Sequence, residues 1–411
     1  MQTNLADFIR DTPAGRVADA ILRKCVHCGF CTATCPTYQL LGDELDGPRG
    51  RIYQIKEVLE GVPPTRAIQQ HLDRCLTCRA CETTCPSGVE YAHLLDIGRH
   101  EVDARVPRPL AERAKRWALA RVLPERKRFA AALRLARMGK GVLPDSLAGK
   151  IPAPQEAGPR PAAQHARRWW RLEGCVQPEL KPAIDAAAER VFDRLGISLE
   201  AAPGAGCCGA IEWHLDEQER ARARARRNID AWWPAIEAGE VEGILITASG
   251  CAAQVRDYGF WLAEDPVYAD RAAQVAQRAR DVSEVLAAES ASLEALLLAQ
   301  PTPRGAVAFH APCSLQHGLK VRGVVERLLA RAGYTLVPVR DAHLCCGSAG
   351  TYSLLQAELA EALKRNKLAA LTEHAPARIA SANIGCITHL EQGANVPVQH
   401  WIELLDEALR T

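Results

Sequence analysis

Sixteen cysteines fall into four groups of four, and their spacing constrains the fold of this 411-residue chain more than any other feature. The first eight form a repeat, because C-x2-C-x2-C-x3-C-P occurs at both 25–36 and 75–86. The last eight repeat with a longer period: in each half a cysteine precedes a Cys-Cys-Gly triplet by 32 positions, and one more cysteine follows. The first ten residues do not form a signal peptide, so we expect a reducing compartment. There, clustered cysteines are more often metal ligands or catalytic thiols than disulfides.

The early repeat has the ligand spacing of bacterial ferredoxins, in which the fourth cysteine of one motif binds the cluster of the other. Three thiolates at three-residue spacing can wrap one corner of a cluster, and the proline turns the fourth thiolate away. We therefore expect two [4Fe–4S] clusters with crossed ligands. One is assigned to Cys25, Cys28, Cys31 and Cys85, and the other to Cys75, Cys78, Cys81 and Cys35. Structural zinc, the alternative, leaves the third cysteine and both Cys-Pro steps unexplained.

Between the two sets of cysteines the composition changes. Residues 105–140 hold twelve Lys or Arg and only two acids, with apolar residues at helical spacing. We expect a basic amphipathic helix here, followed by a linker at 151–161, which is rich in Pro and Gly. Two roles stay open for the helix. It contacts an anionic membrane or an acidic partner, or it lies solvated on its own protein.

Short apolar runs that look like buried strands precede the late cysteines, and helical patterns fill the intervals. Strands are expected at 197–199, 243–247, 306–309, 334–339 and 378–380. Helices are expected at 184–195, 321–332 and 354–371, with an earlier one at 52–59. Alternating strands and helices indicate parallel sheets, in which ligands bind beyond the carboxyl ends of the strands. We expect all the late cysteines at that edge.

These patterns predict an α+β multidomain chain. A helical ferredoxin-type domain with two [4Fe–4S] clusters is expected over residues 1–104, and the basic connector with its linker over 105–165. Two α/β modules with parallel sheets are expected over 166–300 and 301–411.

The Cys-Cys-Gly triplets resemble the cysteine-rich "CCG" domain of heterodisulfide reductase-like proteins. In that family each module closes with C-x2-C. Here the last cysteine of that pattern is replaced, by Gln254 three residues after Cys251 and by His389 three residues after Cys386. The candidate site for an additional cluster or a redox function comprises Cys175, Cys207, Cys208, Cys251, Cys313, Cys345, Cys346, Cys386 and His389. We expect extra iron here. Four-ligand clusters, one shared site, vicinal disulfides and metal-free thiols stay open as alternatives.

Other classes of cofactor and partner have little support. Residues 204–209 fit the dinucleotide pattern G-x-G-x-x-G, but the matching segment 342–347 lacks the first two glycines, so these glycines accompany the cysteine pair. A formal net charge of only +2 argues against a nucleic-acid binder. No run of 18 or more apolar residues predicts a transmembrane helix.

Four segments together resemble the iron–sulfur subunits of bacterial glycolate oxidases: residues 27–31, 35–38, 47–52 and 85–89. The resemblance implies a cytoplasmic protein, peripheral on the membrane, that takes electrons from a flavoprotein oxidising glycolate to glyoxylate. It implies a quinone or other membrane acceptor, no catalytic residue in this chain, and no substrate oxidation by the chain alone. The alternatives are an iron–sulfur subunit of a glycerol-3-phosphate, lactate or heterodisulfide reductase-type enzyme, and a redox sensor.

Overall fold

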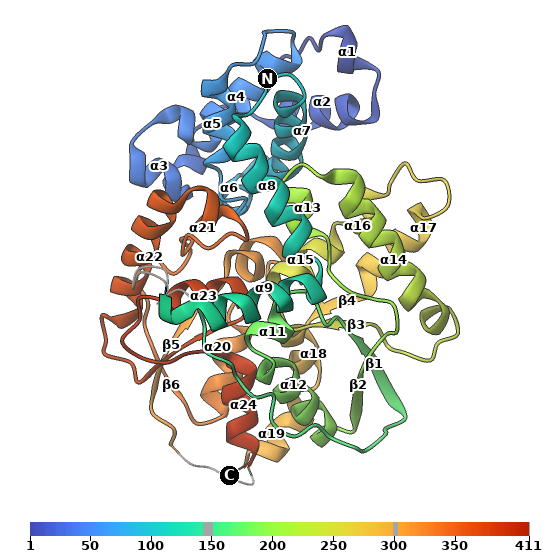
Figure 1. Cartoon of the computed structure of the whole chain (residues 1–411), viewed down its shortest axis with the longest axis vertical. Helices are drawn as coiled ribbons and strands as arrows, with labels where there is room; N and C mark the ends of the chain where they lie inside the picture. The colour runs from blue at the N-terminus through green and yellow to red at the C-terminus, as the bar shows by residue number, and fades with distance from the viewer. Residues whose placement is uncertain (143–150, 299–302, 411) are drawn as a thin grey trace.

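The computed structural model describes residues 1–142, 151–298 and 303–410. Figure 1 shows a cluster of helices at the N-terminal end of the molecule and two sheets with their helices at the other end. The predicted α+β class, the helical ferredoxin-like region and the two parallel sheets are confirmed. Within the described ranges, no helix combines the length and the apolar character needed to cross a membrane.

The ferredoxin-like region consists of short helices around a small apolar core. Its elements are α1 (Asp7–Arg10), α2 (Pro13–Lys24), η1 (Phe30–Thr34), α3 (Pro36–Leu41), η2 (Glu44–Asp46), α4 (Pro48–Leu59), α5 (Arg66–Asp73), α6 (Ala80–Thr84) and α7 (Tyr91–Asp103). Proline at the first position starts α2, α3 and α4, and the Thr12 and Thr65 hydroxyls cap α2 and α5. Helix α4 contains the helix predicted at 52–59. It packs on α7 and buries Ile55 and Leu59.

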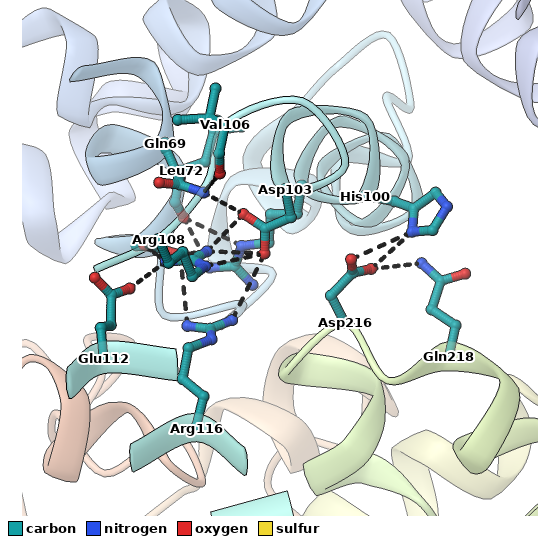
Figure 2. A network of polar contacts seen from close by, with 12 residues as sticks. Gln69, Leu72, His100, Asp103, Val106, Arg108, Glu112, Arg116, Asp216 and Gln218 are labelled. Carbon is teal, nitrogen blue, oxygen red and sulfur yellow. Dashed lines mark hydrogen bonds and ion pairs between the residues drawn. The ribbon is translucent and has the colours of Figure 1, made fainter. Parts of the chain in front are cut away.

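The connector forms two helices where the sequence suggested one, α8 (Leu110–Val122) and α9 (Arg126–Met138), followed by η3 (Gly139–Val142). Pro124 explains the break, because proline has no N–H to donate to an i−4 carbonyl and its ring crowds the preceding turn. Ion pairs join the connector to the ferredoxin-like region (Figure 2). Arg108 lies 2.6 Å from Asp73 and 2.7 Å from Asp103, and it also pairs with Glu112 of α8. Part of the basic charge is therefore neutralised within the protein.

The first module contains the parallel sheet β2-β1-β3-β4. Its strands are β1 (Arg167–Arg171), β2 (Ile197–Ala201), β3 (Ile244–Ile246) and β4 (Ala279–Asp281). Its helices are α11 (Gln177–Leu180), α12 (Ala183–Arg194), α13 (Ala210–His214), α14 (Gln218–Glu237), α15 (Ser249–Arg256), α16 (Tyr258–Trp261), α17 (Ala269–Arg278), α18 (Val282–Ala288) and α19 (Ser290–Leu298). The strands β1 and β4 were not predicted.

The second module repeats this topology with the parallel sheet β6-β5-β7-β8. Its strands are β5 (Ala306–His310), β6 (Thr335–Val337), β7 (Arg378–Ser381) and β8 (Val398–His400). Its helices are η4 (Ser314–Gly318), α20 (Val324–Arg331), α21 (Tyr352–Leu355), α22 (Ala357–Thr372), α23 (Ile384–Glu391) and α24 (Trp401–Arg410). The helix predicted at 354–371 is interrupted at Gln356, where the backbone leaves the helical region (φ −121°, ψ 53°).

The two modules share one apolar core, because each sends its last helices across to the other. Helix α24 packs on α12 and α18 packs on α20, and a single cluster of buried side chains runs through both sheets. Buried His400 extends the contact, since its Nε2 donates to the carbonyl oxygen of Thr247 at 2.9 Å. The modules therefore form one packed unit that supports both sets of late cysteines.

The ferredoxin-like region docks on both modules. Trp213 Nε1 donates to Asp96 Oδ2 at 2.7 Å, and His100 Nδ1 lies 3.0 Å from Asp216 (Figure 2). The hydroxyl of Thr83 bonds to Nδ1 of His317 at 3.0 Å in the second module.

Candidate metal centres

The structure brings three cysteines of the first motif together with the last cysteine of the second. Cys25, Cys28, Cys31 and Cys85 line one hollow, which we call the first hollow. Two left-handed residues, His27 (φ 56°) and Gly29 (φ 85°), fold the short loop so that its cysteines face the same space.

The complementary set lines a second hollow. Its cysteines are Cys35 from the first motif and Cys75, Cys78 and Cys81 from the second. Cys81 also reaches the wall of the first hollow, so the two spaces adjoin. The structure thus places Cys85 in the first hollow and Cys35 in the second, and the crossed ligation stays a prediction.

The two hollows differ in their surroundings. The first hollow lies near the surface, because Cys28 is exposed and the side chains of Val26 and Phe30 beside it are 68% and 61% exposed. The second hollow contains the guanidinium of Arg51, which is 1% exposed. Although burial opposes the charge, the neighbouring Cys75, Tyr91 and Cys35 groups raise the pKa of Arg51 above its ordinary value. Arg51 also lies 3.3 Å from the buried carboxylate of Asp46, so a guanidinium with its own ion-pair partner accompanies the second set of thiols.

These thiols are suited to bind a metal cluster. Burial raises the pKa of Cys31 to about 11 and that of Cys81 well above its ordinary value, so without metal these thiols are protonated at neutral pH. Binding as thiolates needs a compensating cation, and all-sulfur sites at this spacing are typical of iron–sulfur clusters. Hydrogen bonds to sulfur are present, since the hydroxyl of Tyr91 donates to Cys75 Sγ at 3.7 Å.

The late cysteines lie beyond the carboxyl ends of the strands, as predicted. In the first module, the thiols of Cys175, Cys207, Cys208 and Cys251 form a chain of neighbours in that order, each shifting the pKa of the next. In the second module, the same chain runs through Cys313, Cys345, Cys346 and Cys386. All sixteen cysteines are free thiols.

The backbone conformation and close packing of each Cys-Cys-Gly triplet explain why its third residue is glycine. Gly209 and Gly347 adopt φ of 87° and 89°, and a Cβ on Gly347 would lie 2.5 Å from the carbonyl oxygen of Ala360. The backbone N–H of each glycine also donates to the first cysteine of its pair, at 3.5 Å and 3.4 Å. Glycine thus lets the turn approach the helix and support a sulfur atom.

Comparisons with known proteins agree with this geometry. A model of the 4Fe-4S dicluster domain matches residues 21–89, and a model of the cysteine-rich domain matches 171–256 and 307–391. The glycolate oxidase iron-sulfur subunit of Escherichia coli (strain K12) is 55% identical over 100% of this chain and 99% of its own length. This chain belongs to the family of glycolate oxidase iron–sulfur subunits.

Other relatives are more distant. The probable glycolate oxidase iron-sulfur subunit of Bacillus subtilis (strain 168) is 29% identical over 96% of this chain and 95% of its own length. Lactate utilization protein A of the same organism is 23% identical over 56% of this chain and 96% of its own length. As a glycolate oxidase iron–sulfur subunit, the chain carries iron–sulfur clusters of the 4Fe-4S type and forms part of an oxidoreductase complex.

The histidine that the sequence singled out bonds to the backbone. His389 is buried, and its Nε2 donates to the carbonyl oxygen of Ala360 at 3.3 Å. A different histidine, His310 at the end of β5, lies within ligand distance of two thiols. One of its ring nitrogens and the sulfurs of Cys346 and Cys386 all lie within 4.8 Å of one another. Burial lowers the pKa of His310 to about 3, so its ring is neutral. Its position three residues before Cys313 was the only signal in the sequence.

Proposed function

We propose that this subunit carries electrons within a complex that oxidises glycolate to glyoxylate, from a flavoprotein partner toward a quinone or another membrane acceptor. The observation that carries the proposal is the presence of two adjoining hollows, each lined by at least four cysteines, in a chain that matches the Escherichia coli subunit over its full length. The chain itself supplies thiols and a scaffold, and the substrate chemistry belongs to the partner.

The proposed ligands follow the two hollows. Cys25, Cys28, Cys31 and Cys85 hold one [4Fe–4S] cluster, and Cys75, Cys78, Cys81 and Cys35 hold the other. Each cluster, when bound, supplies a one-electron carrier whose potential depends on charge, hydrogen bonds and solvent exposure. The buried Arg51 and the Tyr91 hydroxyl act on the second site, whereas the first site is open to solvent.

The exposed rim of the first hollow is the proposed docking face for the flavoprotein. Val26 and Phe30 present apolar side chains there, and apolar exposed patches commonly mark interfaces. A partner on this face comes close to the first set of cysteines. From there the second set leads inward, since Cys81 borders both hollows.

The domain boundaries along the chain are also part of the proposal. Residues 1–104 form the two-cluster domain, 105–165 the connector, and 166–300 and 301–411 the two modules. The membrane-facing part of the connector is α9, because Arg128, Arg134, Leu135 and Met138 are exposed along it. Helix α8 contributes less, since its Arg116 lies 3.8 Å from Asp73 and faces the protein. Peripheral attachment through α9 is consistent with basic residues near an anionic bilayer.

Reduction of the iron–sulfur chromophore by glycolate tests this function. The purified chain alone is expected to stay oxidised when glycolate is added, and addition of the flavoprotein partner is expected to bring rapid reduction. Phe30→Lys should slow that reduction, and Val62→Lys serves as the control because Val62 is apolar and exposed but does not line the first hollow. Glycolate reduction of the chain alone, or no reduction with the partner, would refute the proposal.

A further inference from the structure

His310 is an unpaired polar group in the interior of the second module. Its side chain is 1% exposed, and neither ring nitrogen has a hydrogen-bond partner among the residues that the structure describes. Buried polar groups are almost always satisfied, because an unmade hydrogen bond costs about 1–3 kcal/mol. The ring lies beside the thiols of Cys346 and Cys386, with the three donor atoms within 4.8 Å of one another. A metal ion is the partner that such a group of donors lacks.

The equivalent position in the first module holds no ligand. Leu172 stands three residues before Cys175, as His310 stands three residues before Cys313. Both positions are buried, so the difference is chemical and not a matter of burial. The two modules therefore offer different donor sets, four thiols in the first and four thiols with an imidazole in the second.

The two modules also differ in a nearby charge. In each module an alanine packs on the glycine of the Cys-Cys-Gly turn, Ala221 in the first and Ala360 in the second. Seven residues later the first module has Asn228 and the second has Lys367. Asn228 bonds to the carbonyl oxygen of Cys207 at 3.0 Å. Lys367 is 3% exposed, and its Nζ donates to the backbone oxygen of Asp341 at 2.7 Å. Among the described residues Lys367 forms no ion pair with a carboxylate, so its charge is free to balance thiolates.

We propose that the second module holds an iron–sulfur centre with His310 as its nitrogen ligand, alongside thiolates from Cys313, Cys345, Cys346 and Cys386. Imidazole replaces the cysteine missing from the end of the module, and it does so from β5, not from the position of His389. Replacing a thiolate by a neutral imidazole raises the potential of an iron–sulfur centre. The inference goes beyond the proposed function, because it concerns a third centre and does not depend on the substrate.

Iron and sulfide per chain, measured on anaerobically purified full-length protein, test the inference. Two [4Fe–4S] clusters account for about eight irons, and the wild-type chain should contain more than that. His310→Leu, which installs the residue of the first module, should lose only the excess iron and keep both ferredoxin-type EPR signals. His389→Gln, which also installs the residue of the first module, should keep the wild-type iron content.

Labelling with 15N-histidine adds a test that needs no variant, so a failure of His310→Leu to fold does not decide the matter. Pulsed EPR of the wild-type chain should show a histidine nitrogen coupled to the additional centre. Eight irons in the wild type, zinc in place of the excess iron, or an additional centre without nitrogen coupling would each overturn the inference. Because the two ferredoxin-type signals are recorded in the same samples, their loss would instead count against the proposed function.

Discussion

Cys78 of the ferredoxin-like region and Cys313 of the second module pack against the same small apolar cluster, and the neighbouring thiols of Cys345 and Cys78 raise the pKa of Cys313 well above its ordinary value. Leu76 and Tyr352 contribute to this cluster from the two sides. The cysteines of the second hollow therefore lie next to the cysteines of the second module. The equivalent of Cys313 in the first module is Cys175, and the pKa of its thiol is raised chiefly by Cys207 of the same module.

This proximity predicts a selective effect on one cluster. Cys313→Ala should shift the midpoint potential of the second ferredoxin-type centre by on the order of 20–60 mV, because it removes the sulfur next to Cys78 and with it an electrostatic interaction of about 0.5–1.5 kcal/mol. Cys175→Ala should leave both ferredoxin-type potentials unchanged. EPR-monitored redox titration measures both variants, and equal shifts in the two would contradict the account.

The buried guanidinium of Arg51 is expected to stabilise the reduced, more negative form of the second centre. Arg51→Gln should lower its midpoint potential by roughly 40–80 mV, since a charge at short range in a protein is worth about 1–2 kcal/mol or more. Arg51→Lys keeps the charge and should retain most of the wild-type potential. The same redox titration distinguishes the two variants. An unchanged potential in Arg51→Gln would show that this charge does not act on the second site.

Substitution of Gly347 should destabilise the second module. Alanine there combines a left-handed backbone with an overlap against the carbonyl oxygen of Ala360, which together cost about 3 kcal/mol. Gly350→Ala is the matched control, because its φ is also positive but nothing lies within 4 Å of an added Cβ. Its cost should be about 1 kcal/mol. Thermal unfolding of both variants measures the difference, and similar melting temperatures would refute the packing argument.

The docking of the ferredoxin-like region should weaken as pH rises. The hydrogen bond to Asp216 raises the pKa of His100 above its ordinary value of 6.5 (Figure 2). A raised pKa means that this contribution is complete below pH 6.5 and is lost as the pH rises through the pKa in the folded protein. His100→Gln and Asp216→Asn should both flatten the fall of the melting temperature between pH 6.5 and 8.5. If the slope stayed as in the wild type, another group would be responsible.

The features that depend on spacing along the chain could be predicted from the sequence. The ferredoxin repeat, the cysteines at the strand ends and the duplicated sheet all follow from periods and motifs. The strand β1 was missed because Arg167-Arg-Trp-Trp-Arg171 carries three charges. The structure buries Arg171 against Asp185 and Glu189, and these partners lie 14 and 18 residues away.

Other features depended on contacts that no spacing reveals. The basic residues of the connector looked available for a membrane, but Arg108 forms ion pairs with Asp73 and Asp103. His389 stood at the position of a missing cysteine, yet its ring bonds to the backbone, and His310 is brought to the thiols by the register of β5 against β7. Which of two nearby histidines faces sulfur is decided by strand pairing and not by the motif.

The crossed assignment of the ferredoxin-type ligands is the central claim, and EPR of four single variants tests it most directly. Cys28→Ser and Cys78→Ser each mark one cluster, because each lies in the middle of its own motif. The account predicts that Cys35→Ser perturbs the same signal as Cys78→Ser, and that Cys85→Ser perturbs the same signal as Cys28→Ser. If Cys35→Ser instead altered the signal marked by Cys28→Ser, each motif would hold its own cluster and the account would be wrong.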